Sequence, residues 1–164
     1  MKEKVIVANP YNDDHISMIE EYENNNRISH TTSDYLKNIK NMLSEVDYRQ
    51  LEQERPEVVT TLLLIREKEV LTMAHLIGEK DRRVCRITVD STAEPKQEEK
   101  LLDESEKYAF GTLGMEDIIY MQEAGNHIPS QHFLNRGYDD LGIEDNMHIY
   151  SLSKTAEKIS SHTI

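Results

Sequence analysis

The chain has 164 residues, of which 37% are hydrophobic and 30% charged, and this composition suits one soluble globular domain with a substantial core. Its formal net charge is −12, so nucleic acid would be repelled and nucleic-acid binding is not expected. The acidity is typical of a well-solvated surface, and it would also attract small cationic or amine-bearing ligands.

The compartment can be predicted from what the chain lacks. The longest apolar run, residues 58–65, is far too short to span a bilayer, and the N-terminal residues form no signal-peptide pattern. We therefore expect no membrane segment. The only cysteine, Cys85, excludes an internal disulfide, which predicts a cytoplasmic protein. Cys85 alternates with Ile87 and Val89 on an apolar strand face, so we expect an inert core thiol.

The N-terminal part predicts a strand and two helices. Apolar residues at 4–8 indicate the strand, and Asn12 or Asp13 can cap the first helix. Thr31 or Thr32 can start the second helix. Its apolar residues recur at the spacing of a half-buried helix: Tyr35, Leu36, Ile39, Met42, Leu43 and Val46.

The middle of the chain changes to the period of strands. Residues 57–66, 70–77 and 84–90 are rich in β-branched and apolar residues and are separated by short polar turns. This pattern predicts an antiparallel meander. Pro95 is well placed in the first turn of a helix that runs to about Phe110.

The C-terminal part predicts a crossover. Residues 117–122 form a strand after the helix that begins at Pro95, and a strand, a helix and a strand in this order imply a right-handed parallel connection. A helix follows, and residues 147–152 form the last strand. The predicted order is β-α-α-β-β-β-α-β-α-β, an α+β fold with a mixed sheet. We expect one domain over 1–153 and a polar tail over 154–164.

The last predicted helix has marked ends. Asn126 can cap it, Pro129 lies in its first turn and Gly137 can close it. Together with the element order, this stretch resembles the GNAT superfamily of acyl-coenzyme A-dependent N-acyltransferases. Family members often carry an Asn followed by an aromatic-rich segment that ends in Gly-Phe. Here Asn126 lies eleven residues before Gly137, at the family's spacing, and Tyr138 takes the place of the Phe.

The resemblance implies a site for acetyl-coenzyme A. The cofactor would lie in a V-shaped opening between the strands at 84–90 and 117–122, where backbone groups of the first strand would hold the pantetheine arm. An amine would attack the thioester directly, without a covalent enzyme intermediate. The cofactor-binding residues that the resemblance implies are Ile87, Thr88, Val89, Lys96, Gln97, Asn126 and Phe133.

One departure from the family concerns the phosphate-binding loop. The family usually carries glycines there, which bring backbone N–H groups against the pyrophosphate at a helix start. This sequence has no glycine between residues 78 and 111. Aligned by its leucines, it places Lys96 and Glu98 at the glycine positions, and a slip of one residue places Gln97 and Glu99 there. Either alignment predicts an acidic side chain that repels the phosphates.

Candidate catalytic residues lie on the predicted strands. His75 could act as a general base or be a structural histidine, and Asp90 could act as a base or end its strand in a turn. Phe133 stands where the family often has a Tyr whose hydroxyl protonates the leaving thiolate. Tyr120 could supply that hydroxyl or be a core residue.

A metal site is not expected, because the histidines form no ligand signature. His127 and His132 are five residues apart and would not share a helix face.

Two functions remain open. The first is a GNAT-like N-acetyltransferase that acts on a small-molecule amine or a protein amine. The second is a catalytically inactive GNAT-fold module, with a binding or regulatory role, that has lost coenzyme A pyrophosphate binding. A strand near the C-terminus could pair across a homodimer.

Overall fold

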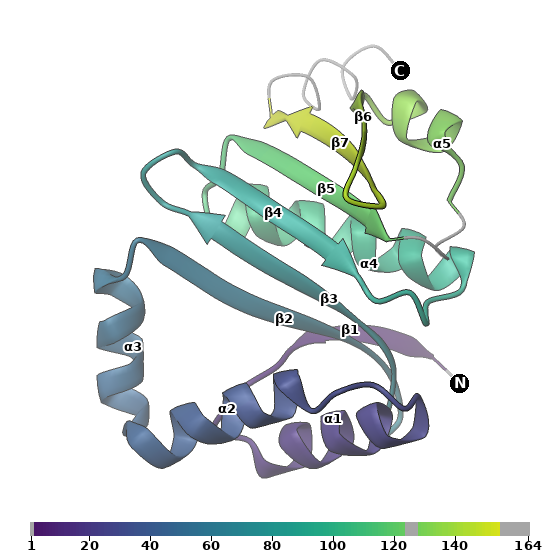
Figure 1. The fold of residues 1–164 in the computed structure, drawn as a ribbon. Helices are drawn as coiled ribbons and strands as arrows, with labels where there is room; N and C mark the ends of the chain where they lie inside the picture. Colours follow the sequence, from purple (N-terminus) through teal and green to yellow (C-terminus); the bar gives the residue numbers. More distant parts are fainter. Residues whose placement is uncertain (1, 124–127, 155–164) are drawn as a thin grey trace.

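The structure, a computed structural model, describes residues 2–123 and 128–154. In this part of the chain, seven strands form one sheet in the order β1-β2-β3-β4-β5-β7-β6 (Figure 1). The strands are β1 (Glu3–Val7), β2 (Glu57–Arg66), β3 (Glu69–Glu79), β4 (Val84–Val89), β5 (Asp117–Glu123), β6 (Asp139–Glu144) and β7 (Met147–Ser153). The helices are α1 (Asp13–Asn25), α2 (Thr31–Met42), α3 (Glu45–Glu54), α4 (Pro95–Lys107) and α5 (Ser130–Asn135), and a π-helical segment, η1 (Tyr108–Thr112), follows α4.

The sheet confirms the predicted meander and crossover. β2, β3 and β4 pair antiparallel in sequence, whereas β4 and β5 pair parallel. Helix α4 lies between β4 and β5 in the chain and makes the connection (Figure 1). The fold class is therefore the predicted α+β arrangement with a mixed sheet.

Each face of the sheet carries its own hydrophobic cluster. On β2, Leu62 and Leu64 belong to the cluster that α4 covers, whereas Leu63 and Ile65 belong to the cluster that α1 and α2 cover. This alternation follows from the two-residue period of a strand, and it explains why β2 reads as an unbroken apolar run. The two faces of the sheet are therefore separate environments. Alternate residues along a strand point to opposite faces, so the position of a residue in the strand decides which cluster its side chain joins.

Two predicted helix starts are confirmed. Asn12 caps α1, because its Oδ1 accepts from the backbone N–H of Asp14 at 3.0 Å and of His15 at 3.2 Å. Pro95 stands in the first turn of α4. The helix ends at Lys107, where the π-helical segment takes over.

The prediction of one continuous helix through Val46 is wrong. Helix α2 ends at Met42, Leu43 has an extended backbone, and Ser44 starts α3 by accepting from the backbone N–H of Asp47 at 3.1 Å. Met42 and Val46 are 79% and 75% exposed. The apolar spacing continued across the break by chance, and the capping serine marked the true start of a new helix.

The predicted element order also omitted β6. This outer strand pairs with β7 alone, and most of its residues are exposed. Leu141 and Ile143 are 59% and 76% exposed. Because β6 buries no apolar face, its sequence carries no alternation that could have revealed it.

Helix α5 begins at Ser130, with Pro129 at its N-cap, and is shorter than predicted. Gly137 closes it as predicted: its φ of +96° is a conformation that favours glycine, and its N–H donates to the Leu134 carbonyl at 3.1 Å. The predicted cap Asn126, and the predicted tail after residue 154, lie outside the described residues.

Candidate functional site

The parallel strands β4 and β5 separate at one end. Their ladder stops at Ile87 opposite Tyr120, although β4 continues to Val89 and β5 to Glu123. On its other side β4 stays paired with β3 as far as Ala74 opposite Val89. The end of pairing therefore lies between β4 and β5, where the family resemblance implies an opening.

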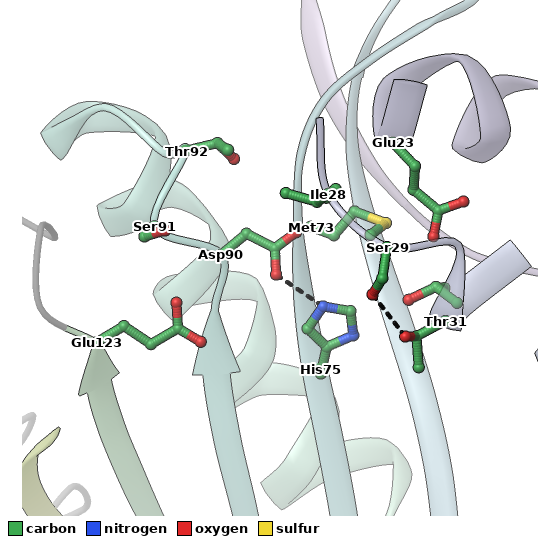
Figure 2. Close-up of a pocket in the computed structure, with 11 residues that line it drawn as sticks. Glu23, Ile28, Ser29, Thr31, Met73, His75, Asp90, Ser91, Thr92 and Glu123 are labelled. Carbon is green, nitrogen blue, oxygen red and sulfur yellow. Dashed lines mark hydrogen bonds and ion pairs between the residues drawn. The ribbon is translucent and has the colours of Figure 1, made fainter. Parts of the chain in front are cut away.

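A cavity of about 410 Å³ adjoins the ends of these strands, on the face of the sheet that α1 and α2 cover. Its walls come from the end of α1, the α1–α2 loop, β3 and the ends of β4 and β5 (Figure 2). The lining residues that the structure describes are Glu23, Ile28, Ser29, Thr31, Thr32, Met73, His75, Asp90, Ser91, Thr92 and Glu123.

His75 and Asp90 form a pair in this cavity. The Nε2 atom of His75 lies 2.9 Å from Oδ1 of Asp90, and the two side chains are 31% and 18% exposed. Because a carboxylate only accepts hydrogen bonds, Nε2 carries the hydrogen. Among the described residues Nδ1 has no hydrogen-bond partner, and its side of the ring faces Ser29 and Thr31 (Figure 2). With the hydrogen on Nε2, this tautomer presents Nδ1 to the cavity as a proton-accepting nitrogen.

Asp90 is itself held in place. The Tyr22 hydroxyl donates to its Oδ2 at 2.8 Å and lies 2.6 Å from the Thr92 hydroxyl, which is 3.2 Å from that of Thr72. Burial, reinforced by the charge of Asp90, raises the pKa of Tyr22 far above its ordinary value, so the hydroxyl keeps its proton. Asp90 therefore has one oxygen fixed by Tyr22 and the other available to orient His75.

Glu123 is a cavity residue that the sequence analysis did not select. It ends β5, across the opening from Asp90 (Figure 2). Burial and the charge of Asp90 raise the pKa of its carboxyl, whereas His75 and a backbone hydrogen bond from Ser91 act in the opposite direction. The sequence did contain a signal for Glu123. It is a carboxylate at the end of β5, and β5 is the neighbour of β4, which ends just before Asp90.

Tyr120 does not lie with His75 and Asp90. Its side chain is fully buried in the cluster beneath α4, where the hydroxyl donates to Oε2 of Glu98 at 2.5 Å. Burial, and then the charge of Glu98, raise its pKa well above the ordinary value for tyrosine. Tyr120 thus ties α4 to β5 on the face of the sheet opposite the cavity.

The strand residues predicted to hold a pantetheine arm border the opening. Ile87 and Val89 are fully buried in the cluster beneath α4, and Thr88 lies opposite His75 in the β3–β4 register. The lining of the cavity beside the opening does not include these three residues, and their part in holding a pantetheine arm stays a prediction.

The start of α4 fits a diphosphate less well. Glu94 caps the helix in a capping box with Gln97, whose Oε1 accepts from the Glu94 N–H at 2.9 Å. Pro95 has no N–H to offer. Lys96 is exposed, so it can supply one positive charge near the helix start.

Glu98 departs from the expectation of repulsion at this loop. It is fully buried, and its Oε2 accepts from the Tyr120 hydroxyl, so its charge is not presented at the surface where a phosphate would bind. Glu98 therefore lies in the core, whereas Glu99, the acid that the alternative alignment places at this loop, is half-buried and its Oε1 lies 3.5 Å from Nε2 of His132. Glu94, which is exposed, remains near the helix start.

Phe133 lies in an aromatic cluster inside the protein. It is fully buried and stacks on Tyr150 with ring centroids 4.1 Å apart and an interplanar angle of 12°. Its centroid is 5.2 Å from that of Tyr120 and 5.5 Å from that of Tyr138. The position is structural in the described residues, and its part in cofactor binding stays a prediction, as does that of Asn126.

Among the described residues, the remaining reactive groups form no second site. Cys85 is fully buried, and burial raises the pKa of its thiol to about 12, which confirms the prediction of an inert core thiol. Within residues 2–123 and 128–154, no group of three His, Cys, Asp or Glu side chains could hold a metal ion. In the same part of the chain, no helix has the length and apolar character needed to cross a membrane.

Comparisons with known proteins identify the fold. No family model matches the chain, and no curated protein matches it in sequence. Solved structures do match. The spermidine/spermine N-acetyltransferase SpeG from Vibrio cholerae, in mutant form, is 12% identical over 98% of this chain and 99% of its own, with a TM-score of 0.62. FdhC, a nucleotide-linked sugar GNAT, is 13% identical over 98% and 92%, with a TM-score of 0.60.

A third match comes with a ligand. The N-acetyltransferase PseH from Campylobacter jejuni, in complex with acetyl coenzyme A, is 11% identical over 93% of this chain and 99% of its own, with a TM-score of 0.56. Together with the parallel β4–β5 pair that separates at one end, these similarities show that the chain has the GNAT fold.

Proposed function

We propose that the protein is an N-acetyltransferase that transfers an acetyl group from acetyl-coenzyme A to an amino group of a small molecule. The observation that carries the proposal is the His75–Asp90 pair, which lines a cavity beside the opening between β4 and β5. The names of similar structures point the same way, since SpeG and the aminoglycoside N-acetyltransferase AAC(6')-Ib11 both act on amines.

The residues of the cavity would handle the proton of the amine. Nδ1 of His75 faces the cavity and can accept that proton while Nε2 donates to Asp90. Asp90 would hold the required tautomer and stabilise the imidazolium that forms, and Tyr22 would keep Asp90 in position. Bound acetyl-coenzyme A would supply a thioester carbonyl, so the new C–N bond forms as the C–S bond breaks, and coenzyme A leaves as a thiolate that takes up one proton.

The acetyl donor would be held mainly along β4. The segment Ile87–Val89 borders the opening, and the exposed Lys96 offers a positive charge at the start of α4. Because Pro95 and the Glu94–Gln97 capping box leave few backbone donors there, we expect a weaker grip on the diphosphate than a glycine loop would provide. The acetyl donor site should therefore depend on the strand opening more than on the helix start.

The test is a direct titration of acetyl-coenzyme A, followed by an assay of thiol release with a panel of small amines. Micromolar binding and amine-dependent thiol release would support the proposal. Asp90→Asn should abolish most of the release without preventing binding of acetyl-coenzyme A. If neither heat nor a thermal shift is seen at millimolar ligand, the transferase proposal fails.

A second candidate is a GNAT-fold binding module without acetyl transfer. It is favoured by the start of α4, where the family's glycines are replaced and Glu94 caps the helix. The same titrations separate the two candidates, because a binding module would retain an amine ligand in the cavity and ignore acetyl-coenzyme A.

Two earlier expectations stay predictions. A homodimer could form through the exposed edge of β6, the outermost strand next to β7. The single cysteine, which is buried, is consistent with a reducing, cytoplasmic location.

A further inference from the structure

The acidic side chains that line the cavity outnumber the basic ones. Of the described residues that line it, Glu23, Asp90 and Glu123 are acidic and none is lysine or arginine. Its only other titratable lining residue is His75, whose Nε2 is already engaged by Asp90. A ligand with one ammonium group would leave most of this negative charge unbalanced.

The carboxylates lie at opposite sides of the cavity. Asp90 directly follows β4 and Glu123 ends β5, whereas Glu23 comes from α1 on the far wall, and Met73 with Ile28 lies between them (Figure 2). The cavity therefore presents negative charge at two separated places with apolar surface in between. This arrangement matches an aliphatic chain that carries an amino group at each end.

Glu23 is a built part of the wall. Its side chain is only 1% exposed, and its Oε1 accepts a short hydrogen bond from the Ser33 hydroxyl. The Ser33 N–H approaches Oε2 at 3.4 Å, and His30 Nδ1 lies 3.5 Å from Oε1. These contacts cap α2, which has no side-chain cap of its own. They also hold the carboxylate in one place just behind the cavity wall, so its charge would act on a cation in the cavity across a short distance.

Resting on the proposed function, we infer that the acceptor is a short aliphatic diamine or polyamine. One amino group would lie beside Asp90 and Glu123, within reach of Nδ1 of His75, and the second would lie on the side of Glu23. The methylene groups would cover Met73 and Ile28. The same charges would disfavour an amine that also carries a carboxylate or a phosphate.

Binding without any acetyl donor tests the inference separately from catalysis. The probes are 1,4-diaminobutane and spermidine, with butylamine and 4-aminobutanoate as matched comparators of equal chain length. At low ionic strength we expect 1,4-diaminobutane or spermidine, or both, to bind about tenfold more tightly than butylamine, because a second ammonium group is attracted by the charge of Glu23. 4-Aminobutanoate should bind most weakly, and added salt should reduce the difference.

The variant Glu23→Gln tests the assignment of the second amino group. The amide keeps an oxygen that can accept from Ser33 but removes the charge, so the polyamine-to-butylamine affinity ratio should fall to about threefold or less. Glu21→Gln is the matched control, since Glu21 is an exposed acid on the same helix and lies outside the cavity lining. Thermal unfolding of both variants shows whether α2 remains capped.

Each outcome has a separate meaning. Equal affinity for butylamine and both polyamines, or an unchanged ratio in folded Glu23→Gln, overturns the inference. If polyamines bind selectively but no thiol is released from acetyl-coenzyme A, the dication site stands and the proposed transferase activity fails.

Discussion

His75 lies on β3 and Asp90 directly follows the adjacent strand β4, and their side chains meet at 2.9 Å on the face of the sheet that α1 and α2 cover. The contact leaves Nδ1 of the imidazole directed into the cavity, while Tyr22 holds the other oxygen of Asp90 at 2.8 Å. Three elements thus cooperate to orient one proton-accepting atom.

Asp90→Asn should lower kcat by about 100-fold or more, because an amide can donate to Nε2 and so favour the wrong histidine tautomer. The measurement is kcat against pH for amine-dependent thiol release. Asp140→Asn is the matched control: Asp140 also pairs with a histidine, His148, at 2.7 Å, but on β6 and β7 away from the cavity. Equal losses in both variants would contradict a role for the His75 pair.

Tyr22→Phe should keep the ring packing and remove the hydrogen bonds to Asp90 and Thr92. We expect about 0.5–1.5 kcal/mol of lost stability for a bond of this kind, together with a shifted pH–rate profile, because Asp90 is less firmly held. Rates measured across pH separate this positioning role from simple destabilisation. Tyr35→Phe, at an exposed position on α2, should change neither quantity.

Glu94→Ser should strengthen binding of acetyl-coenzyme A about threefold to tenfold, since it removes an exposed negative charge at the start of α4 and retains a good helix cap. Titration at two salt concentrations measures the effect, which should shrink as salt rises. Glu104→Ser, on the same helix, is the control. Glu98 is unsuitable for this test because it is buried against the Tyr120 hydroxyl. An unchanged affinity in Glu94→Ser would place the diphosphate elsewhere.

Glu123 should make stability depend on pH. Its pKa is raised in the folded protein, so the native state holds the proton more tightly than the unfolded chain. This contribution is fully present below the unfolded pKa and is lost as pH rises through the folded pKa. Glu123→Gln cannot ionise, so its unfolding midpoint relative to the wild type should increase with pH.

Thermal unfolding of the wild type and Glu123→Gln from about pH 4 to about pH 8 checks this direction. The control is Glu144→Gln, which removes an exposed carboxylate at the end of β6 and should give a nearly constant difference. A Glu123→Gln difference that decreases with rising pH would show that the carboxylate is stabilised, and not desolvated, in its charged form.

Phe133→Ala should destabilise the protein by about 3–5 kcal/mol, the range for removing a fully buried phenylalanine ring. The stacking partner Tyr150, 4.1 Å away between centroids, would lose its neighbour. Leu134→Ala, next in the chain but 43% exposed, should cost about 1 kcal/mol or less. Urea unfolding of both variants measures the loss in free energy of unfolding. Equal losses in the two variants would contradict a core position for Phe133.

Local pattern was sufficient for the elements that bury an apolar face. The strands β2 to β5 and the crossover through α4 follow from hydrophobic period and from turn residues. Asn12, Pro95 and Gly137 marked helix ends through backbone requirements that neighbouring residues do not change. The sequence analysis did not predict β6 and α3 as separate elements, because they bury few side chains and their sequences therefore carry weak periodicity.

The local alternation of residues predicts that Cys85 and Ile87 enter one cluster and that Asp90 lies on the opposite face of the sheet. The contacts of Asp90 with His75 and Tyr22, and of Tyr120 with Glu98, follow from the three-dimensional arrangement of the strands and helices. These contacts join residues far apart in the chain, so they depend on strand register and helix placement. No local period encodes those, because they are set by the packing of the whole sheet.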